Sequence, residues 1–239
     1  MLFQRFIQSA VGFALALLAT PLLVMLGIPM QNIIVIVLIC SFTQALVGTG
    51  KLKSHVPWKM SIYTNILAIV GYICGLIALK RLISLDNNEI KLIIGILLCL
   101  IVFIILIFRV KSYKSLHWGW ALTAFTVSGF ITGLSGMGGP ILAIWALSKN
   151  WSVEKIRAYL FSVFFISIPI QLIFLYSIFG YEIIEYIYMS LLLLPIVVIV
   201  AFIGIPIGNK LPKKNMRIIV LTILFLIGFS SILTAIFKV

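Results

Sequence analysis

Long apolar stretches recur along the whole chain and set the first limit on its fold. Eight of them can be recognised, at about residues 6–26, 33–50, 61–79, 92–108, 119–147, 158–178, 184–208 and 218–237. A helix needs roughly 20 apolar residues to cross a bilayer, and stretches of this length are typical of transmembrane helices. Because a helix satisfies its own backbone hydrogen bonds in lipid, the sequence predicts an all-α polytopic membrane protein with about eight hydrophobic segments.

The charged residues lie in the short connections between these stretches. The chain carries 18 Lys and Arg against five Asp and Glu, which gives a formal charge of +13. In a soluble protein such a charge would indicate binding to nucleic acid. In short loops between apolar segments, Lys and Arg instead set the orientation of the protein in the bilayer. We therefore expect the lipid bilayer as a partner, and no nucleic acid.

The cysteines and the uncharged interior of the segments argue against several kinds of site. Cys40, Cys74 and Cys99 all lie in apolar stretches and form no CxxC pair, so we interpret them as small core residues and expect no metal site. No Asp, Glu, Lys, Arg or His lies in the middle of an apolar stretch. This pattern argues against a carboxylate proton relay and against a charged ion-pair site.

A glycine-rich stretch, GFITGLSGMGGP at 129–140, interrupts the fifth segment. Each glycine inside a helix costs about 1 kcal/mol relative to alanine, and proline costs about 3 kcal/mol. Broken backbone at membrane depth is tolerated only where it is buried in protein or lines a cavity. Many transporters hold their substrates at such breaks. We therefore predict two half-helices that meet inside the membrane.

A weak internal repeat divides the chain into two halves. Residues 7–12 align with 131–136, and the GxxxG at 71–75, followed by basic residues, resembles the one at 204–208. Each half is then one broken segment followed by three ordinary ones. The sequence predicts two four-segment repeats in one membrane domain, with the first at 1–110 and the second at 111–239.

The loop charges predict how these repeats are oriented. If the fifth segment enters and leaves on the same side, the loops at 51–59, 109–114, 149–157 and 210–217 fall together with 13 of the Lys and Arg, and only five remain elsewhere. This bias obeys the positive-inside rule. Symmetry then predicts a broken or re-entrant first segment in each repeat and inverted repeats, a common plan of transporters.

The glycine-rich break also suggests what the protein binds. A half-helix that starts after Gly138, Gly139 and Pro140 presents unpaired N–H groups and a positive dipole end, which suit a small anion. We expect the substrate-binding residues to be Thr132, Gly133, Ser135, Gly136, Gly138 and Gly139, their first-half counterparts Gln8, Ser9 and Gly12, and the amides Gln44 and Gln171. As alternatives, Gly129 and Gly133 allow close helix packing, and the two amides form hydrogen bonds between helices.

The sequence resembles the sulfite exporter TauE/SafE family, also called TSUP. The resemblance rests on GLSGMGG at 133–139, the stretch at 12–28, the basic loop at 51–59 and the GxxxG followed by basic residues in each half. It implies a cytoplasmic-membrane permease of two related halves, and members are linked to sulfite, sulfoacetate and other sulfur-containing or organic anions. The chain departs from the family pattern at 13–19, which is mainly Ala and Leu where glycines are usual.

We expect a secondary transporter, without cofactor, that moves a small anion such as sulfite, a sulfonate or a related organic anion by alternating access around the break. One alternative is an assembly or scaffold subunit without transport activity. Another is a membrane enzyme or electron carrier, for which the sequence lacks intramembrane His pairs, paired cysteines and clustered acids. The sequence leaves open whether the protein forms a homo-oligomer and whether a proton or a sodium ion is coupled to transport.

Overall fold

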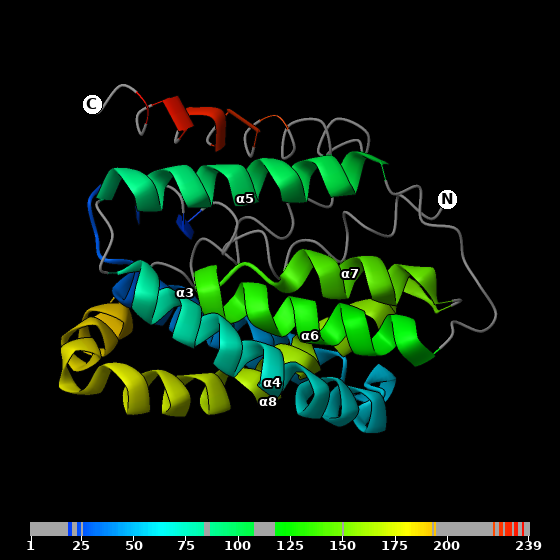
Figure 1. The fold of residues 1–239 in the computed structure, drawn as a ribbon. Coiled ribbons are helices and arrows are strands. Elements are labelled where there is room, and N and C mark those ends of the chain that lie inside the picture. The colour runs from blue at the N-terminus through cyan, green and yellow to red at the C-terminus, as the bar shows by residue number, and fades with distance from the viewer. Residues whose placement is uncertain are drawn as a thin grey trace.

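The computed structural model describes residues 19–20, 23–24, 26–83, 87–107, 118–149, 151–192 and 194, and isolated positions between 222 and 236. They form the helices α3 (Met30–Lys51), α4 (Trp58–Leu82), α5 (Asn87–Ile107), α6 (Trp118–Ser135), α7 (Gly139–Ser148) and α8 (Val153–Phe179), and the 3-10 turns η1 (Lys53–His55) and η2 (Gly180–Ile183) (Figure 1). The described part of the chain is mostly helical and holds no β-strand, which confirms the all-α prediction at that level. The eight segments and the inverted repeat stay predictions.

Three helical stretches are long and apolar enough to cross a membrane: Met30–Lys51, Trp58–Leu82 and Val153–Leu192. The outer face of α4 has the character expected of a lipid contact. Ile62, Ile66 and Val70 follow one another at successive turns and are 49%, 58% and 63% exposed. Single exposed apolar residues are common in soluble proteins, whereas a continuous apolar surface marks an interaction site. Together with the length of the helices, this face indicates a multi-pass membrane protein.

The helix boundaries follow from local sequence signals. Pro29 and Pro57 precede the first turns of α3 and α4, where the missing N–H of proline costs no hydrogen bond. Ser152 caps α8 by accepting a hydrogen bond from the Lys155 backbone N–H. At its other end α8 stops at Gly180, whose φ of 64° lies in the left-handed region that favours glycine.

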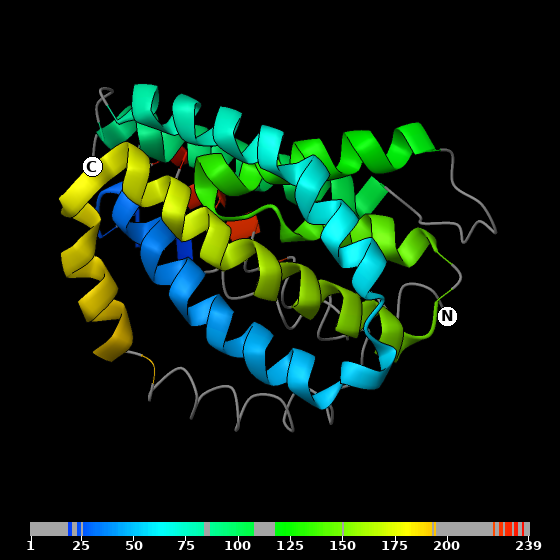
Figure 2. The ribbon, with the colours of Figure 1, turned by 90° about the horizontal axis from the view of Figure 1, so that it is seen from below.

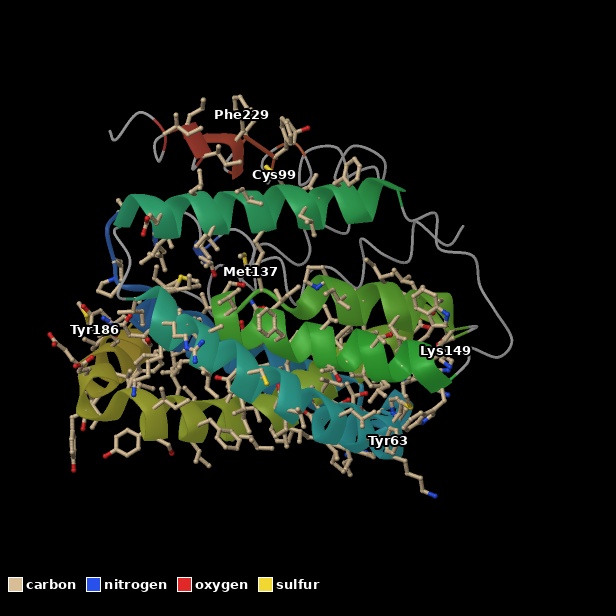
Figure 3. All side chains as sticks on the ribbon, viewed as in Figure 1. Tyr63, Cys99, Met137, Lys149, Tyr186 and Phe229 are labelled. Carbon is tan, nitrogen blue, oxygen red and sulfur yellow. The ribbon has the colours of Figure 1, made fainter. Side chains whose placement is uncertain are left out.

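The helices bring the basic loops to one end of the bundle. Tyr63, near the start of α4, lies with its ring centroid 6.2 Å from that of Trp118 at the start of α6. The Trp151 ring, just before α8, lies 5.9 Å from that of Trp145 in α7. Figure 3 shows Tyr63 and Lys149 at this end and Tyr186 at the opposite end. We call it the basic end; it carries Lys51, Lys53, Lys59, Lys149, Lys155 and Arg157.

The end of α4 and the starts of α3 and α5 meet at the other end, where Met30, Leu82 and Ile90 line one small indentation together with Leu134 near the end of α6. This end holds both signs of charge, with Lys80 and Arg81 as well as the acids Glu89, Glu182 and Glu185. The loops at 51–59 and 149–157 therefore share an end, as the charge pattern predicts. The loops at 109–114 and 210–217 lie outside the described residues.

Helices α4 and α6 pack backbone against backbone through two glycine pairs. A Cβ on Gly71 would collide with the Thr126 carbonyl oxygen, and one on Gly75 with that of Phe130. In return, a Cβ on Gly129 would collide with the Ala68 carbonyl oxygen, and one on Gly133 with that of Tyr72. Small residues at this spacing let membrane helices approach closely. The GxxxG of each helix therefore fits into the other.

Helix α8 lies between α3 and α4 (Figure 2). Its contact with α3 is apolar: the Phe42 and Phe165 rings stack with centroids 5.8 Å apart, and Gly48 lies against the ring of Phe161. Helix α5 runs along the side of the α6–α7 pair that faces away from α4 and α8 (Figure 1). The core of the described residues lies between these layers and includes Phe125, Met137 and Tyr159, all at most 1% exposed.

Candidate functional site: a broken helix hairpin beside a neutral cavity

The predicted break is present, and it turns the fifth segment into a hairpin. Helix α6 ends at Ser135, and α7 begins at Gly139 with Pro140 in its first turn. Between them Gly136 adopts a φ of 74°, a conformation that glycine reaches at little cost. The Phe125 ring lies edge-on to that of Trp145 at 4.7 Å, so α7 runs back along α6. Figure 3 places Met137, within the break, between the two ends of the bundle.

Serine and threonine side chains hold the hairpin closed. The Ser128 hydroxyl donates to the Gly138 carbonyl at 2.8 Å, which ties the start of α7 to the middle of α6. Thr132 donates to the Ser128 carbonyl at 2.7 Å, and Ser135 donates to that of Ile131 at 2.9 Å. Both hydroxyls that the sequence suggested as anion donors are therefore used on backbone carbonyls one turn earlier.

Gly138 is a place where the structure leaves no room for a side chain. A Cβ there would collide with the Thr132 Oγ1 atom and with the Ser128 carbonyl oxygen. Gly138 is also the residue before the first turn of α7, and no side chain caps that turn. The first N–H groups of a helix have no partner within it, and Gly138, the residue just before them, lies against Thr132.

The glycines of the break differ in the residues that surround them. Gly133 faces the backbone of α4, as does Gly129. A Cβ on Gly136 would lie 3.7 Å from Val37 Cγ1 and 3.9 Å from Thr20 Oγ1. The Thr20 hydroxyl itself donates to the Ser135 carbonyl at 3.3 Å. Gly138 and Gly139 start α7. Gly133 therefore packs against the backbone of α4, whereas Gly138 lies against Thr132.

A cavity lies beside the start of α7, between α4, α6, α7 and α8. It encloses about 430 Å³ of empty space, including space open at its mouth, and about 30 Å³ of it can be entered by water. One water molecule needs roughly 10–15 Å³ by that measure, so the cavity in this conformation accepts only very small molecules. Its polar lining residues are Asn65, Tyr72, Ser128, Thr132, Ser167 and Gln171, and the others are apolar or glycine.

Gln171 is the polar group in this cavity whose hydrogen bonds are incomplete. Its side chain is 9% exposed, and its Oε1 atom is buried without a hydrogen-bond partner. By contrast, Asn65 Nδ2 donates to the Ser61 carbonyl at 2.8 Å, and Tyr72 Oη donates to the Gln171 carbonyl at 3.1 Å. A buried amide oxygen without a partner is costly unless a donor from a ligand or water completes its bonds. The cavity therefore contains one open acceptor, which an O–H or N–H group could fill.

The electrostatics of the cavity come from dipoles. Among the residues that the structure describes, no Asp, Glu, Lys, Arg or His lines it, and no group of three or more His, Cys, Asp and Glu could hold a metal ion. The start of α7 contributes a partial positive charge. A neutral site with backbone and amide donors can hold a small anion and also release it.

The structure thus brings together only part of the predicted set. Thr132 and Gln171 line one cavity, and Gly138 lies against Thr132. Gln44 does not line it, although its Oε1 atom is also buried without a partner. Gln8, Ser9 and Gly12 lie outside the described residues.

Sequence reasoning missed four polar residues of the cavity: Asn65, Tyr72, Ser128 and Ser167. A signal for Asn65 was present, because Ser61, Thr64 and Asn65 follow one another at helical spacing in an otherwise apolar segment. Ser128 likewise precedes Thr132 by one turn. Such spacing shows which residues share a helix face but not which helix they face.

The comparison with protein families agrees with this architecture. The family model described as "Sulfite exporter TauE/SafE" matches residues 1–231 of the chain. No curated protein and no solved structure matches significantly. The match covers both the glycine-rich hairpin and the helices that form the cavity. The chain therefore belongs to the sulfite exporter TauE/SafE family of membrane transporters.

Proposed function

We propose that the protein is a secondary transporter that moves a small anion, such as sulfite, a sulfonate or a related organic anion, across the cytoplasmic membrane. The observation that carries the proposal is the α6–α7 hairpin, whose second helix begins beside a cavity lined by polar but uncharged side chains, Gln171 among them. Membership of the sulfite exporter TauE/SafE family supports transport as the activity. No observation favours the scaffold or enzyme alternative.

In this proposal the anion is held by groups that carry no net charge. The donors are the first N–H groups of α7 and the Nε2 group of Gln171, whereas Gln171 Oε1 accepts from water or from a protonated oxygen of the solute. Gly138 and Gly139 allow the anion to approach the backbone. The hydroxyls of Thr132 and Ser135 join when they rotate away from their carbonyl partners, because a hydroxyl hydrogen can reorient. Gly133 and Gly136 shape the hairpin, and Gln8, Ser9 and Gly12 supply the first-half contacts. Gln44, which does not line the cavity, takes the alternative role of an amide between helices.

The mechanism follows the two-repeat plan. Residues 1–110 and 111–239 form inverted repeats of four segments each, whose first segments are broken or re-entrant. Transport then proceeds by alternating access, as one group of helices rocks against the other around the anion. The shared basic end of the loops at 51–59 and 149–157 supports a cytoplasmic location for that end.

Uptake into proteoliposomes of the purified protein tests the proposal. The panel is labelled sulfite, sulfate, thiosulfate, sulfonates and small carboxylates, with pH and sodium gradients applied in turn. We expect saturable uptake of one class of anion, lost in Gly138→Ala because a Cβ there pushes α7 off α6. Gly50→Ala is the matched control, since a Cβ on Gly50 meets nothing within 4 Å. Absence of uptake under every gradient, or normal uptake by Gly138→Ala, would contradict the proposal.

A further inference from the structure

Polar side chains join α4 to α8 near the basic end. Ser61 Oγ and Ser162 Oγ are 2.6 Å apart, and one turn further Thr64 Oγ1 and Tyr159 Oη are 2.7 Å apart. All four residues are 0% exposed. Buried hydroxyls in a membrane helix need partners, because lipid offers none. Here each hydroxyl meets a hydroxyl of the facing helix, and those of Ser61, Thr64 and Ser162 also reach backbone carbonyls one turn earlier.

Polar contacts between α4 and α8 continue as far as the cavity. Asn65 Nδ2 donates to the Val163 carbonyl at 3.3 Å, and Tyr72 Oη donates to the Gln171 carbonyl at 3.1 Å. From Ser61 to Tyr72 this covers roughly 16 Å of helix at 1.5 Å per residue. We call it the polar seam; it consists of Ser61, Thr64, Asn65 and Tyr72 on α4 and Tyr159, Ser162 and Gln171 on α8.

The neighbouring helix contacts are of a different kind. Helices α4 and α6 interlock through glycines, with backbone touching backbone, and α3 meets α8 through stacked phenylalanine rings. Parting either contact would expose apolar surface or break close packing. Parting the polar seam instead exchanges hydroxyl–hydroxyl bonds for bonds to water, which changes the free energy little. Of these three contacts, the seam is therefore the one at which the helices, α4 and α8, can separate most easily.

We propose that the polar seam is the route by which a small anion passes between the basic end and the cavity, and that the direct hydrogen bonds between α4 and α8 close it in this conformation. The inference deepens the proposed function and rests on it for the identity of the solute. Lys59, Lys155 and Arg157 lie within four residues of Ser61 or Tyr159 at the outer end of the seam, and their charges raise the local concentration of anions. The inner end of the seam contains Asn65 and Gln171, which also line the cavity.

Cross-linking across the seam tests the inference. Ser61→Cys and Ser162→Cys are combined after Cys40, Cys74 and Cys99 are replaced by alanine. The pair is bridged with dibromobimane, which forms thioethers that sulfite does not cleave. We expect bridging to reduce sulfite uptake at least tenfold, while the same reagent leaves each single variant within about twofold of its untreated rate. A bridged Tyr63→Cys, Trp118→Cys pair, which joins α4 to α6, is expected to keep its uptake. Full uptake by the bridged seam would overturn the inference.

Access of a water-soluble reagent gives a second readout that needs no transport. In vesicles with the basic end outside, Ser162→Cys is expected to react with a membrane-impermeant thiol reagent at least tenfold faster than Ile66→Cys on the lipid-facing side of α4. If Ser162→Cys reacts no faster than Ile66→Cys, the seam does not open and the inference is wrong. Reaction of Ser162→Cys in a protein that takes up no anion would support the route and contradict the anion-transport proposal.

Discussion

Replacement of Gly75 by alanine tests the backbone packing of α4 against α6. A Cβ at Gly75 would collide with the Phe130 carbonyl oxygen and stand 3.0 Å from the Leu134 nitrogen. Both atoms belong to the α6 backbone, so the clash cannot be relieved by turning a side chain. The two helices must move apart, which also loosens the reciprocal contacts of Gly129 and Gly133. We therefore expect Gly75→Ala to destabilise the protein although alanine favours helix.

The magnitude follows from two opposing effects. Alanine in place of a helical glycine gains up to about 1 kcal/mol, and overpacking of a well-packed contact costs about 1–3 kcal/mol. Gly50→Ala in the last turn of α3 makes the same kind of gain without a clash, because a Cβ on Gly50 meets nothing within 4 Å. The difference between the two variants therefore reports the overpacking, about 1–3 kcal/mol, or roughly 2–12 °C in the unfolding midpoint for a chain of this size.

Thermal unfolding of both variants in the same detergent measures this difference. The midpoint of each is followed by tryptophan fluorescence and by the fraction that stays monodisperse after heating. We expect Gly75→Ala to unfold at a lower temperature than Gly50→Ala. A midpoint for Gly75→Ala equal to or above that of Gly50→Ala would show that α4 and α6 do not touch backbone to backbone.

Two further predictions concern the cavity and the topology. Gln171→Leu removes the Nε2 group proposed to donate to the anion, and since a hydrogen bond to a charged group is worth about 1.5–3 kcal/mol, we expect sulfite uptake to fall roughly tenfold or more. Gln44→Leu, outside the cavity, should keep uptake within about twofold, and equal losses in both variants would remove Gln171 from the site. Single cysteines at Ser54 and Lys149 should react with an impermeant thiol reagent from one side of the membrane and one at Tyr181 from the other; labelling of the first two from opposite sides would contradict the hairpin.

The break in the fifth segment could be predicted because its signals are local. Glycines crowded together and followed by Pro140 make a continuous helix costly, and the structure ends α6 at Ser135 and restarts the helix at Gly139. The same argument could not divide the glycines between packing and binding. Gly129 and Gly133 form a GxxxG that fits the α4 backbone, and that contact depends on a helix more than 50 residues earlier in the chain.

Only part of the cavity lining could be predicted from the sequence. Thr132 belongs to the glycine-rich stretch, and Gln171 is an amide in an apolar segment, so both could be selected from the sequence. Asn65 and Ser167 face them only because α8 packs on α4. Their place depends on how helices pair, which a single polar residue in an apolar segment does not reveal. The sequence also could not show that the hydroxyls of Thr132 and Ser135, expected to donate to the anion, instead donate to carbonyls within α6.

The central claim, that a small anion binds in the cavity at the start of α7, is tested most directly by ligand-dependent stability. A ligand that binds the folded state at about 100 times its Kd stabilises it by about 2.7 kcal/mol. We predict that sulfite raises the unfolding midpoint of the wild type and of Gln44→Leu by several degrees, beyond a control salt at equal ionic strength, and leaves Gln171→Leu unchanged. An equal rise in Gln171→Leu, or no rise in a wild type that takes up sulfite saturably, would contradict the account.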